Sequence, residues 1–239
     1  MTALLAETGV RTGLPRLNEP APPFEAVTTH GPVRLSDYTG SWLILFSHPA
    51  DFTPVCTTEF LAFAEIAPQL RARGVELLGL SIDSVYSHIA WTRNIKERTG
   101  VEIPFPVIAD LNKEVAMAYG MVMPGESKTE TSRCVFVMDP NGIVRAMIYY
   151  PLTTGRNMHE ILRLVDALQT SDANKVATPA NWTPGDAVVI PAPMTTEAAD
   201  QRVTQGFDCV DWYLCRKPLE TTTPSPTSQQ WAASTPAAS

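Results

Sequence analysis

The chain has 239 residues, of which 44% are hydrophobic and 18% charged, a composition typical of a folded globular protein. Its 18 Lys and Arg residues and 25 Asp and Glu residues give a formal charge of −7. No cluster of basic residues is present, so neither nucleic acid nor an anionic membrane is expected as a partner. No stretch approaches the roughly 20 apolar residues of a membrane-spanning helix, and residues 1–10 do not resemble a secretion signal. We therefore expect a cytoplasmic protein.

The first half of the chain predicts strands that alternate with helices. An unbroken apolar run at 42–46 predicts a strand that is buried on both faces. A polar turn follows at 49–54, and then a helix with one apolar face, which we expect Pro68 to kink or interrupt. Further strands are expected at 75–81 and 107–108, and further helices at 84–98 and 113–119.

The second half predicts a hairpin, a helix and a change of composition. Strands at 134–138 and 143–150 flank Asn141-Gly142, which is typical of a hairpin turn. A final amphipathic helix is expected at 157–168. Together these elements predict an α/β fold with a mixed central sheet flanked by helices, over residues 1–172. Residues 173–218, rich in proline and aromatic side chains, predict a separate arm. Residues 219–239 hold little to bury and predict a disordered tail.

The chain contains four cysteines, Cys56, Cys134, Cys209 and Cys215. None of them forms a C-x-x-C pair or lies beside a histidine cluster, so no metal site is expected. Cys134 opens an apolar strand and is interpreted as a small core residue. Cys209 and Cys215 lie among aromatic residues in the arm, where they could simply be packed thiols.

Cys56 has the environment of a reactive thiol. It falls in the first turn of a helix that follows a buried strand, and free N–H groups at a helix start lower a thiol pKa from about 8.5. Thr53, three residues earlier, can offer its hydroxyl to the sulfur and to a substrate. Pro49 can shield the sulfur from water. Arg133, just before a buried strand, is a candidate for the cation that stabilises developing charge.

These residues resemble the active-site signature of the peroxiredoxins. The pattern P-x-x-x-T-x-x-C is present from Pro49 to Cys56, and the longer segment 47–59 resembles the one-cysteine, or peroxiredoxin-six-like, subfamily with a long C-terminal extension. Thr131-Ser132-Arg133 and the segment 150–157 resemble other stretches of that subfamily. The two late cysteines resemble those of its archaeal-type thioredoxin peroxidases. The resemblance covers roughly residues 15 to 218.

The resemblance implies a thioredoxin-like fold with a C-terminal dimerisation arm. It also implies a thiol-dependent peroxidase for antioxidant defence, which reduces hydrogen peroxide and organic hydroperoxides through a Cys56 sulfenic acid, without a cofactor. A thioredoxin-type protein or another thiol reductant would recycle the enzyme. Homodimers, commonly assembled as a decameric ring of five dimers, are the expected form.

The resemblance also suggests roles for less certain residues. Cys215 is the candidate resolving cysteine across the subunit boundary, and Cys209 is an accessory or alternative one. His48 either lines the peroxide pocket or is merely hydrogen-bonded. Glu59 either stabilises the helix start or orients the active-site arginine, and Arg156 is a candidate for a second positive charge near the thiolate.

Two other functions are compatible with a reactive Cys56. One is a peroxide sensor or redox-regulated chaperone, which would also begin with a sulfenic acid but would not turn over. The other is a general dithiol–disulfide oxidoreductase. That function is disfavoured because Thr53 stands where thiol exchange needs a second cysteine.

Overall fold

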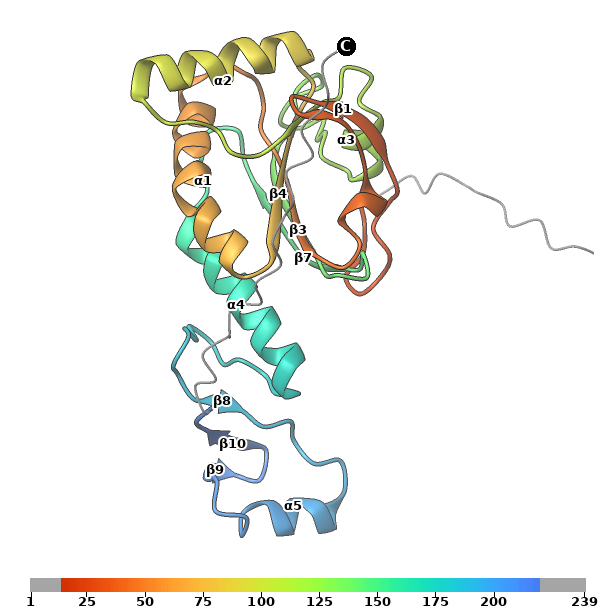
Figure 1. Cartoon of the computed structure of the whole chain (residues 1–239). Coiled ribbons are helices and arrows are strands. Elements are labelled where there is room, and N and C mark those ends of the chain that lie inside the picture. Colours follow the sequence, from red (N-terminus) through yellow and green to blue (C-terminus); the bar gives the residue numbers. More distant parts are fainter. Residues whose placement is uncertain (1–13, 220–239) are drawn as a thin grey trace, which may run out of the picture. The chain divides into compact units, whose positions relative to one another are not determined.

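The computed structural model describes residues 14–219, and the chain divides into two compact units between Leu168 and Gln169 (Figure 1). The predicted disordered tail, apart from Leu219, lies outside the described residues. No helix among residues 14–219 is both long enough and apolar enough to cross a bilayer.

The first unit is built on a mixed sheet of seven strands in the order β2-β1-β5-β4-β3-β6-β7 (Figure 1). β3 pairs in parallel with β4 and antiparallel with β6, and β4 pairs in parallel with β5. These pairings confirm the predicted mixed α/β architecture. The strands are β1 (Glu25–Thr28), β2 (Gly31–Arg34), β3 (Trp42–Ser47), β4 (Val75–Ser81), β5 (Val107–Ala109), β6 (Arg133–Met138) and β7 (Val144–Tyr150).

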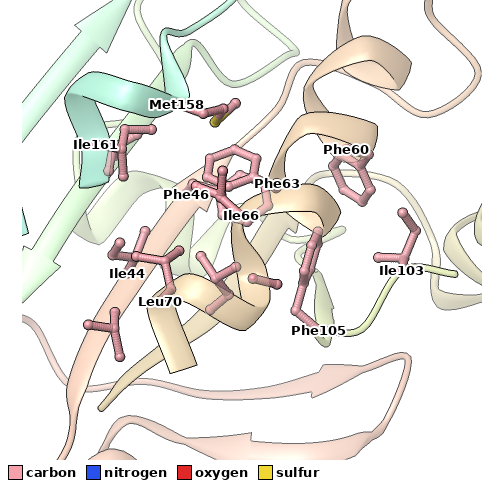
Figure 2. Close-up of a cluster of buried hydrophobic side chains, with 14 of the residues drawn as sticks. Ile44, Phe46, Phe60, Phe63, Ile66, Leu70, Ile103, Phe105, Met158 and Ile161 are labelled. Atoms are coloured by element: carbon pink, nitrogen blue, oxygen red, sulfur yellow. The ribbon is translucent and has the colours of Figure 1, made fainter. Parts of the chain in front are cut away.

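Each face of the sheet carries its own apolar cluster, because successive side chains of a strand point to opposite faces. Ile44 and Phe46 belong to a cluster with residues of α1 (Pro54–Ala72), α2 (Val85–Thr99) and α4 (Met158–Asn174), part of which Figure 2 shows. Leu43 and Leu45 belong to the other, with residues of α3 (Glu114–Ala118). All four side chains are buried. The strand predicted to be buried on both faces is confirmed.

Pro68 was expected to kink or interrupt the helix, and the interruption is wrong, because α1 continues through this residue to Ala72. Proline removes one backbone donor, so only the Ala64 carbonyl loses its usual partner within the helix. Ile66, Ala67 and Leu70 are buried in the core on either side of Pro68. Their packing holds this part of the backbone helical despite the missing hydrogen bond.

The hairpin between β6 and β7 is confirmed, and its turn is stabilised by one aspartate. The Asp139 carboxylate accepts hydrogen bonds from the backbone N–H groups of Asn141 and Ile143. Gly142 adopts a φ of 73°, which its lack of a Cβ permits. The hairpin places Arg133 at the start of β6.

The second unit contains a small antiparallel sheet that the sequence patterns did not predict. Its order is β8-β10-β9, formed by β8 (Val188–Val189), β9 (Asp208–Asp211) and β10 (Leu214–Lys217), and α5 (Thr196–Arg202) lies between β8 and β9 in the chain. Trp182 is buried and donates its indole N–H to the Asp186 carbonyl. Strands of two to four residues show too little alternation to be recognised from a sequence pattern.

Candidate active site

Cys56 lies in the first turn of α1, directly after the turn that follows β3. Thr53 is the residue before the helix and has extended backbone angles, and Pro54 is the first helical residue. Proline suits this position because its missing N–H would have no partner there. Cys56 is fully buried as a free cysteine. The sulfur is therefore held at a helix start, as the sequence predicts, but shielded from bulk water.

Arg133 contacts the Cys56 sulfur from the first position of β6. Its Nη1 lies 3.4 Å from Sγ and 2.7 Å from Oε2 of Glu59. Nε and Nη2 donate to the Leu152 carbonyl at 2.9 and 2.7 Å. The planar guanidinium is thus held from two sides, and one N–H group is directed at the sulfur. A positive charge therefore lies in direct contact with the sulfur.

Glu59 lies between two arginines, one turn after the start of α1. Arg156 donates Nε to Oε1 at 2.8 Å and Nη2 to Oε2 at 2.7 Å. Burial would raise the pKa of the Glu59 carboxyl, but Arg156 and then Arg133 outweigh it and hold the pKa below its usual value. Glu59 is therefore ionised and orients Arg133.

Arg156 bonds Glu59 and two backbone carbonyls of the site, and within residues 14–219 it makes no hydrogen bond to the sulfur. Its Nη1 donates to the carbonyls of Ser47 and Cys134, at 2.9 and 2.8 Å. The guanidinium carbon lies 5.3 Å from the ring centres of both Phe46 and Phe63, which Figure 2 shows beside each other. Two arginines and one glutamate leave one positive charge, which a Cys56 thiolate neutralises. Buried charges need such compensation.

Thr53 and Pro49 belong to the turn that leads into α1. Pro49 is buried and Thr53 is half-buried. The Thr53 hydroxyl donates to the Ala50 carbonyl at 2.9 Å. With its hydrogen used in this way, its oxygen remains free to accept a hydrogen bond from a peroxide.

His48 is fully buried and hydrogen-bonded, and the sequence analysis did not predict its partners. Its Nε2 lies 2.9 Å from Oδ1 of Asp51, which also contacts Nδ1 of His88 at 3.0 Å. Burial lowers the pKa of His48. The three side chains place their ligand-type atoms within 4.8 Å of one another, close enough to hold a metal ion. His88 is 37 residues from Asp51, so no local spacing could reveal the cluster.

The sequence of the AhpC/TSA family matches residues 17–147, and that of the C-terminal domain of 1-Cys peroxiredoxin matches residues 167–206. A peroxiredoxin of Aquifex aeolicus is 58% identical over 85% of this chain and 97% of its own length. A peroxiredoxin 2 of Thermoplasma acidophilum is also 58% identical, over 83% of this chain and 98% of its own length. The chain belongs to the peroxiredoxin family.

Solved structures agree with this assignment. A structure of yeast mitochondrial 1-Cys peroxiredoxin is 41% identical, covers 85% of this chain and 99% of its own, and has a TM-score of 0.75. A structure of a cysteine-to-serine mutant of peroxiredoxin 6 from Arenicola marina is 39% identical, covers 87% of this chain and 99% of its own, and has a TM-score of 0.77. The predicted thioredoxin-like fold is confirmed, and this peroxiredoxin is a thiol-dependent peroxidase.

The two late cysteines of this peroxiredoxin are bonded to each other. Cys209 in β9 and Cys215 in β10 face one another across the hairpin and form a disulfide. Cys215 is buried and Cys209 is half-buried. The pairing lies within the second unit, and the predicted exchange with Cys56 remains a proposal.

Cys134 of the peroxiredoxin is a core residue, as predicted. It is fully buried in the cluster opposite Cys56. Burial raises the pKa of its thiol to about 12. A thiol that stays protonated and enclosed is a poor nucleophile.

Proposed function

We propose that Cys56 reduces hydrogen peroxide and small organic hydroperoxides in antioxidant defence. The Cys56 thiolate attacks one peroxide oxygen, an S–O bond forms as the O–O bond breaks, and the departing alkoxide or hydroxide takes a proton. The products are a Cys56 sulfenic acid and an alcohol or water. The observation that carries this proposal is the 3.4 Å contact between Arg133 Nη1 and the Cys56 sulfur.

The other residues of the site have distinct roles in this reaction. Arg133 stabilises the thiolate and the charge that develops on the peroxide oxygens. Glu59 and Arg156 hold Arg133 in place. The Thr53 hydroxyl oxygen accepts a hydrogen bond from the peroxide, and Pro49 shields the sulfur from water. A second thiol that reaches the sulfenic acid then condenses with it to form a disulfide.

Cys56→Ser tests the assignment of the nucleophile. The variant should consume no peroxide, whereas Cys134→Ser, the same exchange at a buried core cysteine, should retain turnover. Wild-type turnover in Cys56→Ser would refute the assignment. Consumption of no more than about one equivalent of peroxide by the wild type, with excess reductant, would instead support a sensor or a redox-regulated chaperone.

For the resolving step we propose two thiol exchanges. Cys215 attacks the Cys56 sulfenic acid, releasing water and forming a disulfide, and Cys209 then attacks that disulfide. The products are free Cys56 and the Cys209–Cys215 disulfide, the bond present in the structure. Cys215→Ser should accumulate Cys56 as sulfenic or sulfinic acid, and Cys209→Ser should accumulate a mixed Cys56–Cys215 disulfide. Unchanged disulfides and turnover in Cys215→Ser would exclude it as the resolving thiol.

We propose a thioredoxin-type protein as the reductant of the Cys209–Cys215 disulfide. The solved yeast mitochondrial relative is described as resolving through the glutathione and thioredoxin systems, which supports a dithiol or thiol donor. Coupled NADPH oxidation with thioredoxin and its reductase should give steady turnover. Turnover with glutathione and glutaredoxin alone would assign the other donor.

We also propose a homodimer, assembled as a decameric ring, in the cytoplasm. The match to the 1-Cys peroxiredoxin C-terminal domain supports dimerisation through the second unit. Free thiols at Cys56 and Cys134 fit a reducing compartment. Light scattering after size-exclusion chromatography should give ten subunits, and cell fractionation should find the protein in the cytosol. A monomer, or recovery with membranes, would contradict these proposals.

A further inference from the structure

His48, Asp51 and His88 form a buried polar network beside the active-site turn. The Asp51 carboxylate lies between the two rings, 2.9 Å from Nε2 of His48 and 2.8 Å from Nδ1 of His88. The side chains are 0%, 1% and 0% exposed, respectively. The peroxide reaction outlined above uses none of the contacts within this network.

The partners of His88 determine its protonation. Its Nε2 lies 3.1 Å from the Ile108 carbonyl, which can only accept a hydrogen bond, so Nε2 carries a hydrogen. Its Nδ1 faces both oxygens of Asp51, and an ionised carboxylate also only accepts. Burial would raise the pKa of Asp51, but hydrogen bonds from His48 and His88 outweigh it and lower the pKa. His88 is therefore bound at both ring nitrogens, by the Ile108 carbonyl and by the Asp51 carboxylate.

His48 has the opposite arrangement. Its Nε2 donates to Asp51, while its Nδ1 is buried with no hydrogen-bond partner among the described residues. A second hydrogen on Nδ1 would place an unpaired charge in the interior, which is costly. The ring lies tilted against Trp91 and edge-on to Phe60, with ring centres 5.2 and 4.8 Å away. His48 is therefore neutral, in agreement with its lowered pKa, and Asp51 is held between the two rings.

The contact between Asp51 and His88 connects the active-site turn to α2. Asp51 lies within the turn, and its backbone N–H also donates to Asp83, between β4 and α2, at 3.0 Å. His88 lies in the second turn of α2, and Ile108 in β5. Phe52, next to Asp51, has a φ of 56°, an unfavourable angle for an aromatic residue. The contacts of Asp51 offset that strain and fix the path of the chain into Thr53.

We propose that Asp51 and His88 are positioning residues of the peroxidase: the His88 ring, held between the Asp51 carboxylate and the Ile108 carbonyl, anchors the turn that presents Thr53 and the first turn of α1 to the peroxide. The proposal rests on the proposed function of Cys56. It adds a positioning pair from a different helix, which does not contact the sulfur.

Nitrogen NMR of the wild-type protein labelled in histidine tests the protonation directly. His88 should carry hydrogen on Nε2, the nitrogen that faces the Ile108 carbonyl, and His48 on Nε2 alone. His88→Gln assigns the signals. A His88 ring with hydrogen on Nδ1 alone would overturn the proposal, and so would a stoichiometric divalent metal found by elemental analysis and lost in His88→Gln. These results do not depend on peroxidase activity, so they remain decisive even if the proposed function fails.

Asp51→Asn tests the positioning role. It keeps the shape of the side chain but puts an amide N–H group in place of one carboxylate oxygen, so Asp51 can no longer accept from both histidines. The rate constant with hydrogen peroxide should fall about 10- to 100-fold, because the reacting groups are displaced. The ultraviolet absorbance of the Cys56 thiolate should be retained, because Arg133 and Glu59 are unchanged.

Two control variants separate positioning from loss of stability. Glu102→Gln makes the matching exchange in the exposed ion pair with Lys96 and should leave the rate constant unchanged. Val144→Ala truncates a buried residue of the other core cluster and should lower stability without slowing the reaction. An unchanged rate constant in Asp51→Asn, or an equal decrease in Val144→Ala, would overturn the positioning role.

Discussion

Glu59 and Arg133 form a buried ion pair, with Oε2 and Nη1 separated by 2.7 Å and side chains 2% and 4% exposed. The same arginine nitrogen lies 3.4 Å from the Cys56 sulfur. The carboxylate thus holds the arginine that contacts the sulfur. Because Arg156 binds the same carboxylate, the charge balance of the site depends on Glu59.

Glu59→Gln should destabilise the protein by about 3 kcal/mol or more, because it leaves two buried guanidinium groups without their carboxylate. Chemical denaturation measures the change. Glu160→Gln, which removes a largely exposed partner of Arg163, is the matched control and should have little effect. Equal stability of the two variants would contradict the central role of Glu59.

Arg133→Lys should reduce the rate constant with hydrogen peroxide about 100-fold, although it keeps the positive charge. A lysine has no planar fork and cannot bind Glu59 and the Leu152 carbonyl while directing an N–H group at the sulfur. Stopped-flow measurement of peroxide reduction gives the rate constant. A decrease of less than about threefold would show that charge alone suffices.

Acid should destabilise the protein through Glu59 and Asp51. Both carboxyls have folded-state pKa values below their ordinary values of 4.5 and 3.8. Their contribution to stability is therefore complete above those ordinary values and is lost as pH falls toward the folded-state values. Urea denaturation between neutral and acidic pH should show this decline, and it should be shallower in Asp51→Asn. A stability that rises with acidification would contradict the ion pairs.

Pro68→Ala should stabilise the protein by about 1 kcal/mol or more, since alanine restores the hydrogen bond to the Ala64 carbonyl and relieves crowding in α1. Pro68 is exposed, so the substitution leaves no cavity. Thermal unfolding measures the gain. A loss of stability would mean that proline contributes more by restricting the unfolded chain than it costs in the helix.

Local sequence was sufficient for the elements that bury regular apolar patterns. The strand at 42–46, the hairpin at Asn141-Gly142 and the helix after Cys56 all follow from spacing within a few residues. Pro68 does not interrupt the helix, because the packing of Ile66 and Leu70 offsets the hydrogen bond that proline cannot donate. The small sheet of the second unit escaped prediction because its strands are too short to show a period.

The sequence by itself identified the candidate nucleophile: Cys56 at a helix start, preceded by Thr53 and Pro49, is a local pattern, and its resemblance to the peroxiredoxin signature indicated the chemistry. Only the tertiary structure decided which charges meet. Arg133, Arg156 and His88 reach their partners across 74, 97 and 37 residues. Such contacts depend on how strands and helices are arranged in the folded chain, and no spacing along the sequence encodes the distances between them.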